Sequence, residues 1–329
     1  MNRELEIAGF KERKFNTGEV DLNYIVGPDH GPALLLIPAQ MGTWETYLPN
    51  LIPLSRRFQV YALDIRGHGK SDWATGQYSW ASVGKDMRAF VRGVIMRKFI
   101  VSGNSSGGII ALWLAANLPD HVSALVFEDA PVFSVEMPRF KEDRFVYNGL
   151  QHLVDSIGDP ENRDLADYFR GQTLPVAEGR REKKLPGWVA DFFSYFIKRY
   201  EKNHPGQPVD IPYFPGSLRL LFKSLSQFDP DFARAFVDGR FYTGLNHAEA
   251  LKKVKCPTLI MHANWFRHPK FGLVGAMDDK DAARIQQLVP QAEYLKIPAN
   301  HVIHRYKPQE FNEAIVSFAE RHGLLEEGS

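Results

Sequence analysis

Short apolar runs recur along the chain without the alternation expected of a half-buried strand. They occupy residues 33–37, 58–63, 99–102, 124–127, 258–261 and 294–297, after a partly alternating segment at 20–26. A strand covered by helices on both faces has this unbroken apolar character. Helical stretches separate most of the runs, for example residues 79–97 and 109–118. Strands that alternate with helices predict an α/β fold with a mostly parallel sheet flanked by helices.

The alternation stops between residues 134 and 246. This stretch is interrupted by Pro and Gly and predicts helices with no convincing strand. We therefore expect residues 1–133 and 247–329 to form a core, with 134–246 inserted as a helical lid at the carboxyl ends of the strands. Six aromatic residues fall on one predicted helix of the lid: Trp188, Phe192, Phe193, Tyr195, Phe196 and Tyr200. They could simply pack the lid onto the core, but as a group they favour a roomy apolar pocket, with Trp188, Phe192 and Tyr195 as candidate lining residues.

The segment Gly103-Asn104-Ser105-Ser106-Gly107-Gly108 joins an apolar run to a predicted helix. It contains the pattern G-x-S-x-G, in which a serine occupies a sharp turn between strand and helix. Ser105 is the candidate nucleophile, and the backbone N–H of Ser106 is a candidate donor to an oxyanion. The alternative is a glycine-rich turn with a capping serine, so the motif needs partners elsewhere in the chain.

A serine hydroxyl needs a base near neutral pH. His301 follows the last apolar run and precedes a predicted helix at residues 308–322, which places it at the carboxyl edge of the sheet. His304 lies three residues further on, so the two histidines could form part of a metal site. We expect no metal, because no nearby cysteine or carboxylate completes a ligand set.

The base in turn needs a carboxylate that fixes its tautomer. The loop at residues 262–266 follows the next-to-last run and contains no acid. Asp278, Asp279 and Asp281 come later, near a predicted helix start, where carboxylates often only cap. Glu128 and Asp129 end the strand after the nucleophile. Because adjacent strand side chains point to opposite sides, at most one of those two faces the histidine.

A tetrahedral oxyanion needs a second donor besides Ser106. The loop at residues 38–42 follows the first central strand and is expected beside the turn of Ser105. The backbone N–H of Gln40 is the candidate.

Composition limits the partners. Lys and Arg number 40 against 39 Asp and Glu in 329 residues, which gives no electrostatic reason to expect nucleic acid or an acidic membrane. No apolar run approaches the roughly 20 residues of a membrane span, and residues 1–6 lack an apolar signal segment, so a cytoplasmic location is expected. The single cysteine, Cys256, begins an apolar run and is expected to be inert. The composition is compatible with either a monomer or a homo-oligomer.

Taken together, these residues resemble the α/β-hydrolase fold family. Residues 64–71, Asp-Ile-Arg-Gly-His-Gly-Lys-Ser, are similar to the family's D-x-R-G-x-G-x-S loop, and Asn300-His301 stands where the family usually has Gly-His. Two departures are Pro38-Ala39 in place of His-Gly and the missing acid in the 262–266 loop. The resemblance implies a hydrolase with no cofactor.

The missing acid narrows the resemblance to families that place the acid after the strand following the nucleophile. Haloalkane dehalogenases and zearalenone lactone hydrolases do so, and Asp129, 24 positions after Ser105, matches their spacing. Asp129 thus becomes the expected acid and Glu128 the reserve. Dehalogenases and epoxide hydrolases use an aspartate nucleophile, so Ser105 argues against both. Bacterial zearalenone hydrolases are the more similar family, on residues 103–108, 128–131, 64–67 and 273–276; the lid shows little likeness.

The resulting expectation is a Ser-His-Asp hydrolase of a bulky apolar ester or lactone, with a resorcylic macrolactone such as zearalenone as the sharpest version. Two alternatives remain. A serine carbon–carbon bond hydrolase would use the same triad, and a ligand-binding receptor on this fold would have lost catalysis. An intact Ser105, Asp129 and His301 disfavours the receptor.

Overall fold

An eight-stranded sheet forms the centre of the molecule in a computed structural model, which describes residues 3–159, 163–176 and 182–325. The strand order is β1-β2-β4-β3-β5-β6-β9-β12. β1 and β2 are antiparallel to their neighbours, and the remaining pairs are parallel. The strands are β1 (Lys11–Asn16), β2 (Asp21–Val26), β3 (Ala33–Ile37), β4 (Gln59–Leu63), β5 (Phe99–Asn104), β6 (Val122–Glu128), β9 (Thr258–His262) and β12 (Ala292–Lys296). The predicted mostly parallel α/β sheet is confirmed.

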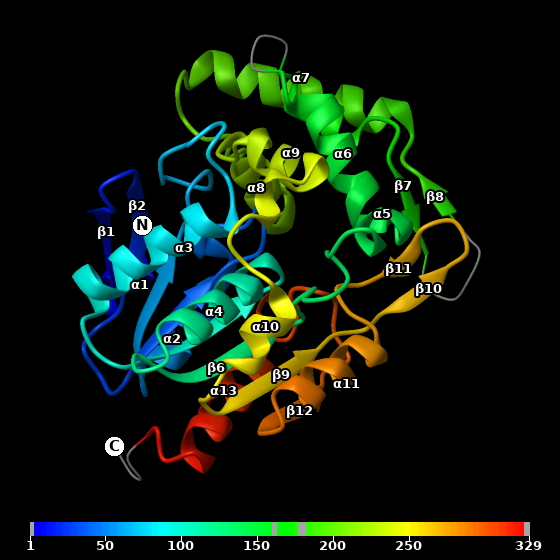
Figure 1. Ribbon diagram of the computed structural model, residues 1–329. Helices are drawn as coiled ribbons and strands as arrows, with labels where there is room; N and C mark the ends of the chain where they lie inside the picture. Colours follow the sequence, from blue (N-terminus) through cyan, green and yellow to red (C-terminus); the bar gives the residue numbers. More distant parts are fainter. Residues whose placement is uncertain (1–2, 160–162, 177–181, 326–329) are drawn as a thin grey trace.

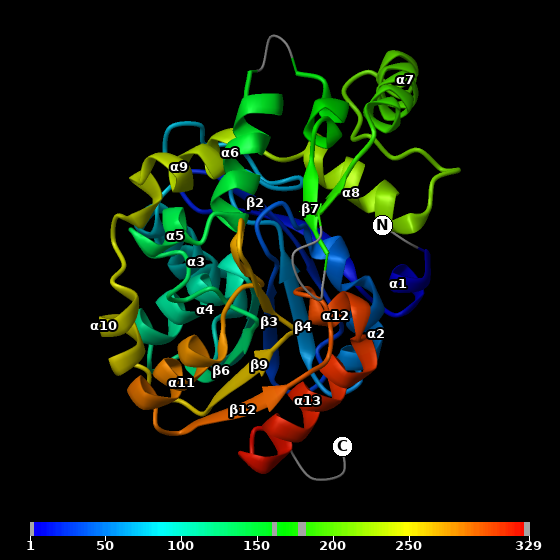
Figure 2. The same cartoon turned by 90° about the vertical axis from the view of Figure 1, so that its right-hand side faces the viewer.

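Helices cover both faces of this sheet (Figure 2). One layer contains α3 (Trp80–Phe90), continued by a π-helical turn η2 (Val91–Ile95), with α4 (Ser106–Asn117), α10 (His247–Lys252) and α11 (Asp279–Leu288). The other contains α1 (Arg3–Ile7), the 3-10 turn η1 (Trp44–Tyr47), α2 (Leu48–Ser55), α12 (Ile303–Tyr306) and α13 (Pro308–Arg321). The predicted helices at residues 79–97, 109–118 and 308–322 are confirmed within a few residues.

The two helical layers explain the unbroken apolar run of β3. Leu35 and Ile37 belong to the core on the α3–α4 side, whereas Leu34 and Leu36 belong to the core on the α2–α13 side. All five side chains of β3 are therefore buried. Burial on both faces removes the need for alternation and makes the strand recognisable only as a short apolar run.

Between β6 and α10 the chain leaves the sheet, and the described helices of residues 134–246, called the inserted segment below, lie over one end of the core (Figure 1). The inserted segment contains α5 (Arg139–Glu142), α6 (Phe145–Ile157), η3 (Leu165–Phe169), α7 (Gly187–Asn203), α8 (Gly216–Ser226), α9 (Pro230–Asp238) and η4 (Arg240–Tyr242). All six aromatic residues named for one lid helix do lie on α7. The expectation of no strand there is wrong, because β7 (Thr173–Pro175) pairs with β8 (Glu182–Lys184).

Three further strands were not predicted. β1 has the sequence KERKFN and is exposed along most of its length, so its edge position gives no apolar signal. β10 (Phe266–His268) and β11 (Gly272–Val274) form a hairpin of three residues per strand in the segment after β9. Runs this short carry too few residues for a pattern of period two to be recognised.

The loop at residues 64–71 connects the core to the inserted segment. Asp64 is buried and accepts hydrogen bonds from the Trp44 N–H (2.8 Å), the Lys70 N–H (3.1 Å) and the Asn23 side chain (2.9 Å). Burial raises its pKa to about 6 in spite of these donors. The Gly67 carbonyl accepts the Asp229 N–H of the inserted segment at 2.9 Å. The loop at residues 64–71 therefore packs the inserted segment against the core.

Arg66 in the same loop is buried against the buried Asp86 through two hydrogen bonds, and it also reaches Glu19 at 2.9 Å. We predict that Arg66→Ala lowers the free energy of unfolding by about 3–5 kcal/mol, because it leaves the Asp86 carboxylate buried and unpaired. Urea denaturation measures this. Arg97→Ala removes an exposed ion pair with Asp29 and should cost less than about 1 kcal/mol. Equal losses in the two variants would contradict the prediction.

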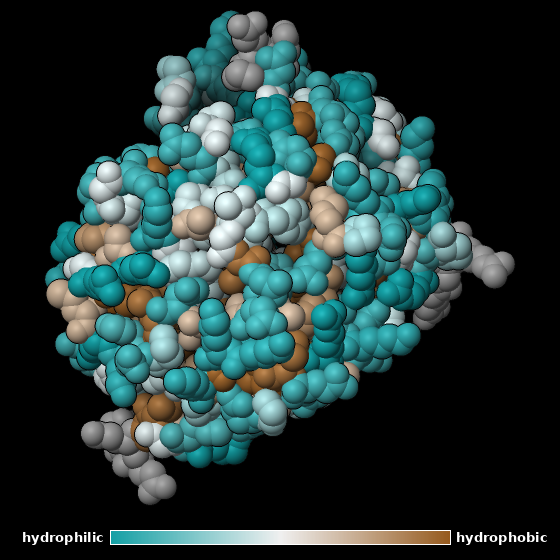
Figure 3. Space-filling view, viewed as in Figure 1, coloured by the Kyte–Doolittle hydropathy of each residue, from teal (hydrophilic) through white to brown (hydrophobic). Residues whose placement is uncertain are grey.

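On the face shown in Figure 3, hydrophilic residues predominate and the apolar residues form separate patches. Among the described helices, none has the length and apolar character needed to cross a membrane. The first two residues of the N-terminal segment, on which the expected location partly depends, lie outside the described residues.

Candidate active site

Ser105 lies in a strained turn between β5 and α4. Its φ of 54° and ψ of −123° fall outside the regions that non-glycine residues normally adopt. The turn is closely packed: a Cβ on Gly103 would lie 2.1 Å from the Gly107 carbonyl oxygen, and one on Gly107 would lie 2.4 Å from that of Ile37. Only glycine fits at these two positions, which explains the G-x-S-x-G spacing. Backbone strain held by such packing is typical of functional sites.

His301 and Asp129 form a direct pair. The His301 Nδ1 lies 2.7 Å from the Asp129 Oδ2, and the Asp129 side chain is completely buried. Asp129 has a positive φ of 44° just beyond the end of β6. Its other carboxylate oxygen accepts the Ala263 N–H at 3.1 Å. The carboxylate is thus held on both sides, and it fixes the His301 ring with Nδ1 as donor and Nε2 free to accept a proton.

The loop after β9 supplies a backbone hydrogen-bond donor to the candidate acid instead of an acid of its own. The backbone of Ala263, in the acid-free 262–266 loop, donates to Asp129. The later acids have other partners: Asp278 caps α11 through the Lys280 and Asp281 N–H groups, and Asp279 accepts from the Trp265 indole at 2.9 Å. Asp281 pairs with Arg139.

The charge of Asp129 controls the His301 ring. Burial opposes protonation of the ring, but the hydrogen bond and charge of Asp129, with a contribution from Glu128, outweigh it and raise the pKa of His301 above its ordinary value. The His301 side chain is still 37% exposed, so its free edge is open to a small molecule. This combination suits a general base that must bind a proton during a reaction.

Glu128 makes a second, parallel pair with His304. The His304 Nδ1 lies 2.8 Å from the Glu128 Oε2, and the His304 N–H donates to Oε1 at 2.9 Å. Both side chains are buried, and the Tyr47 ring stacks on His304 at 3.9 Å between centroids. The two adjacent acids therefore point to two different histidines. His304 therefore has a carboxylate partner of its own.

Asn104 brings the parts of the site together, a role that sequence reasoning missed. Its side-chain amide donates to the His301 carbonyl at 3.0 Å and to the Glu128 carbonyl at 3.1 Å. The N–H of the next residue, Ser105, donates to the same Glu128 carbonyl at 3.0 Å. The serine turn, the end of β6 and the histidine loop are thus connected by three hydrogen bonds. The only signal was the position of an amide side chain inside the motif.

The two residues named as oxyanion donors are joined by a hydrogen bond. The Gln40 N–H donates to the Ser106 Oγ at 2.9 Å, which joins the loop after β3 to the start of α4. The Gln40 N–H therefore already has a neighbouring hydroxyl as acceptor. The neighbouring residue Met41 has a positive φ of 65°, so this loop is also strained.

Two cavities meet the loop at residues 39–42. One, of about 340 Å³, is lined by the loop, Asn104, His304, Arg305 and apolar residues of α8. The other, of about 490 Å³, begins at Met41 and is lined mainly by α6, η3, β7 and Phe271. Both extend between the core and the inserted segment.

The three aromatic residues named as candidate pocket lining lie elsewhere. Trp188, Phe192 and Tyr195 are 68%, 46% and 61% exposed, and neither cavity includes them. The inward side of α7 instead packs Phe193 against Phe169 and Phe222. Lining from the inserted segment comes from α6, η3, β7 and α8, whose residues gave no distinctive sequence signal.

In the part of the chain that the structure describes, no group of three or more histidine, cysteine, aspartate or glutamate side chains is arranged to hold a metal ion. Cys256 is unpaired and partly buried, and burial raises the pKa of its thiol to about 11.

Comparison with known proteins is consistent with this geometry. Residues 32–308 match the model of the alpha/beta hydrolase fold family. A fluoroacetate dehalogenase from a Burkholderia species is 31% identical over 154 residues, which is 44% of this chain and 48% of that protein. The chain thus spans about half the length of this curated relative.

Solved structures extend the likeness over the whole fold. A hydrolase from Pseudomonas aeruginosa PA01 superposes with a TM-score of 0.65 at 19% identity, over 94% of this chain and 98% of that one. The enol-lactonase from Burkholderia xenovorans LB400 gives 0.59 at 15% identity, over 94% and 100%. Identities this low show a shared fold. The family match, the strand order and the strained serine turn lead to one conclusion: the chain belongs to the α/β-hydrolase fold family.

Proposed function

We propose that this protein hydrolyses carboxylic esters or lactones through a triad of Ser105, His301 and Asp129 and an acyl-enzyme intermediate. The observation that carries the proposal is the buried Asp129 paired with His301 at 2.7 Å, tied by Asn104 to the strained turn of Ser105. Nucleophile, base and orienting acid thus come from three segments that hydrogen bonds hold together.

In the proposed reaction, the Ser105 Oγ attacks the carbonyl carbon of the substrate and its proton passes to the His301 Nε2. The imidazolium is stabilised by Asp129 and then gives that proton to the leaving alkoxide. A water molecule, deprotonated by His301, attacks the acyl-enzyme and releases the acid. In a lactone, the alcohol and the acid remain in one molecule.

The oxyanion of each tetrahedral intermediate is assigned to the N–H groups of Ser106 and Gln40. Ser106 starts α4, so its amide is one of the unpaired donors of a helix N-terminus. The Gln40 N–H already points to the same turn through the Ser106 Oγ. A substrate oxygen would replace that hydroxyl as acceptor. Losing one such donor costs roughly 3–4 kcal/mol in the barrier.

The inserted segment is proposed as the lid that selects the substrate. The cavity beside Met41 is large and mostly apolar, with Phe145, Leu150 and Phe271 among its lining residues, which suits a bulky apolar group. The enol-lactonase among the structural neighbours supports lactones as a substrate class. A resorcylic macrolactone such as zearalenone is the sharpest candidate.

The test is a panel of para-nitrophenyl esters of rising chain length together with macrolactones including zearalenone, followed by product analysis. We expect hydrolysis of esters, with kcat/KM rising with acyl length. Mass spectrometry after treatment with a fluorophosphonate should place the adduct on Ser105. Absence of both turnover and labelling, with ligand binding retained, would favour the receptor alternative.

A further inference from the structure

Arg305 carries a positive charge that the described residues do not neutralise. It lies in α12, four positions after His301, and is partly exposed. In the described chain its guanidinium has no carboxylate, carbonyl or aromatic partner. It lines the cavity beside Gln40 and also an open cavity of about 800 Å³ between η1 and α8.

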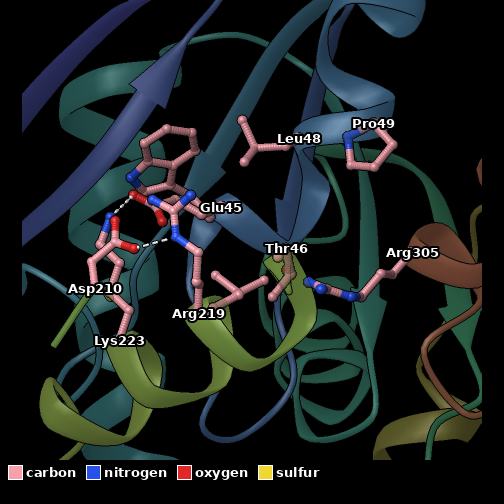
Figure 4. Close-up of a pocket in the computed structure, with 11 residues that line it drawn as sticks. Glu45, Thr46, Leu48, Pro49, Asp210, Arg219, Lys223 and Arg305 are labelled. Atoms are coloured by element: carbon pink, nitrogen blue, oxygen red, sulfur yellow. Dashed lines mark hydrogen bonds and ion pairs between the residues drawn. The ribbon is translucent and has the colours of Figure 1, made fainter. Parts of the chain in front are cut away.

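The other charges around this open cavity are paired. Glu45 meets Lys223 at 2.5 Å, and Asp210 meets Arg219 at 2.6 Å. Figure 4 shows both pairs, and it shows Arg305 pointing toward Thr46 without an interaction to any residue drawn. The two pairs cancel, so Arg305 leaves the lining with one uncompensated positive charge.

The inner cavity places this charge beside an apolar wall. Gln40 and Arg305 both line the cavity, but the buried Gln40 Nε2 presents no surface to it. Much of the remaining lining is apolar, including Leu218, Leu221 and Val302. An unpaired guanidinium beside such a wall favours a ligand that carries both an apolar part and a negative charge. A carboxylate suits this charge, since guanidinium and carboxylate match in charge and geometry.

The cavity adjoins the candidate active site, although neither Ser105 nor His301 is among its lining residues. Asn104, the residue before Ser105, and Gln40, whose N–H is a proposed oxyanion donor, lie in its wall. A substrate whose carbonyl is bound at Ser105 therefore has space for a further group in the direction of Arg305.

We propose that Arg305 binds a carboxylate of the substrate, so that an anionic group on the arm that enters the cavity beside Gln40 raises kcat/KM above that of the matched neutral ester or lactone. This inference rests on the proposed function. The bulky apolar part of the substrate occupies the cavity beside Met41.

The experiment compares matched substrates. The mono-para-nitrophenyl ester of glutaric acid carries a terminal carboxylate, and para-nitrophenyl pentanoate is its neutral counterpart of equal chain length. Phenyl pentanoate with and without a ring carboxylate tests the alcohol arm. Arg305→Gln should lower kcat/KM for the anionic substrate of either the acyl-arm pair or the alcohol-arm pair by about 10- to 100-fold, mostly through a higher KM. For the two neutral substrates, kcat/KM should change less than about 3-fold.

Arg305→Lys keeps the charge and should recover part of the loss. Arg92→Gln removes an exposed arginine in η2, outside both cavities, and should change neither class. Equal losses on anionic and neutral esters in Arg305→Gln would overturn the proposal. If the wild type hydrolyses no ester, the proposed function fails. Calorimetry then tests the inference separately, by comparing the affinity of monomethyl glutarate for the wild type and for Arg305→Gln. Equal affinities would refute the inference.

Discussion

Replacing Ser105 with alanine should lower kcat for ester hydrolysis by about four to six orders of magnitude. The loss is this large because the hydroxyl is the proposed nucleophile, and what remains is catalysis by the oxyanion donors alone. Alanine tolerates the φ of 54° no worse than serine does, and no hydrogen bond of the Ser105 hydroxyl stabilises the fold in the described structure. Thermal unfolding should therefore shift by less than about 2 °C, which separates loss of chemistry from loss of structure.

The adjacent serine provides a matched control. Ser106→Ala keeps the backbone N–H proposed as an oxyanion donor and removes only the hydroxyl that accepts the Gln40 N–H. We expect kcat within about 10-fold of wild type, since the Gln40 amide becomes free for the substrate. Stopped-flow measurement of the para-nitrophenolate burst would show acyl-enzyme formation in Ser106→Ala and none in Ser105→Ala. The reverse pattern would assign the nucleophile to Ser106.

The core of the fold was predictable because each central strand is a separate apolar run. Burial on both faces of β3 and its neighbours leaves a local signature that needs no knowledge of contacts. The edge strand β1 and the β10–β11 hairpin lack that signature, since one is charged and the other is short. Local patterns identify strands that form an apolar run, including the largely exposed edge strand β12, and miss those that are charged or very short.

The residues of the candidate site could be predicted from the sequence, but the histidine with which each acid pairs could not. Strand geometry implies that Glu128 and Asp129 face opposite sides, but it does not say which side holds His301. The structure contains two carboxylate–imidazole pairs, Asp129–His301 and Glu128–His304, and both satisfy the local pattern. Only the burial of the second pair under Tyr47 distinguishes them, and that contact depends on the packing of η1 against α12.

The cavity lining was not predictable for a similar reason. An aromatic residue on a helix indicates burial or exposure only once its face is known. On α7, Phe193 turns inward while Phe192 is about half exposed. Arg305 gave no sequence signal either, because an unpaired cation is recognised only after every neighbouring acid has been found to have another partner.

Asp129→Asn should reduce kcat by about three to four orders of magnitude while leaving KM nearly unchanged. An asparagine keeps the oxygen that accepts the Ala263 N–H, so the local fold is retained. Its amide, however, can donate to the His301 Nδ1 and stabilise the tautomer that carries the proton on Nε2, which cannot accept the proton of Ser105. The wild-type carboxylate excludes this tautomer.

The pH profile of kcat/KM tests the same residue independently. His301 must be neutral to act as base, and Asp129 raises its pKa, so wild-type activity should be lost as pH falls through a value above about 6.5. Removing the Asp129 charge lowers the pKa of His301, and the residual activity of Asp129→Asn should therefore extend to lower pH. Asp279→Asn removes an exposed acid that accepts a hydrogen bond from the Trp265 indole and lies 3.8 Å from the His262 Nδ1, and its profile should match wild type. If Asp278→Asn or Asp279→Asn loses activity and Asp129→Asn does not, the orienting acid is in the loop before α11, and the buried 2.7 Å pair has only a structural role.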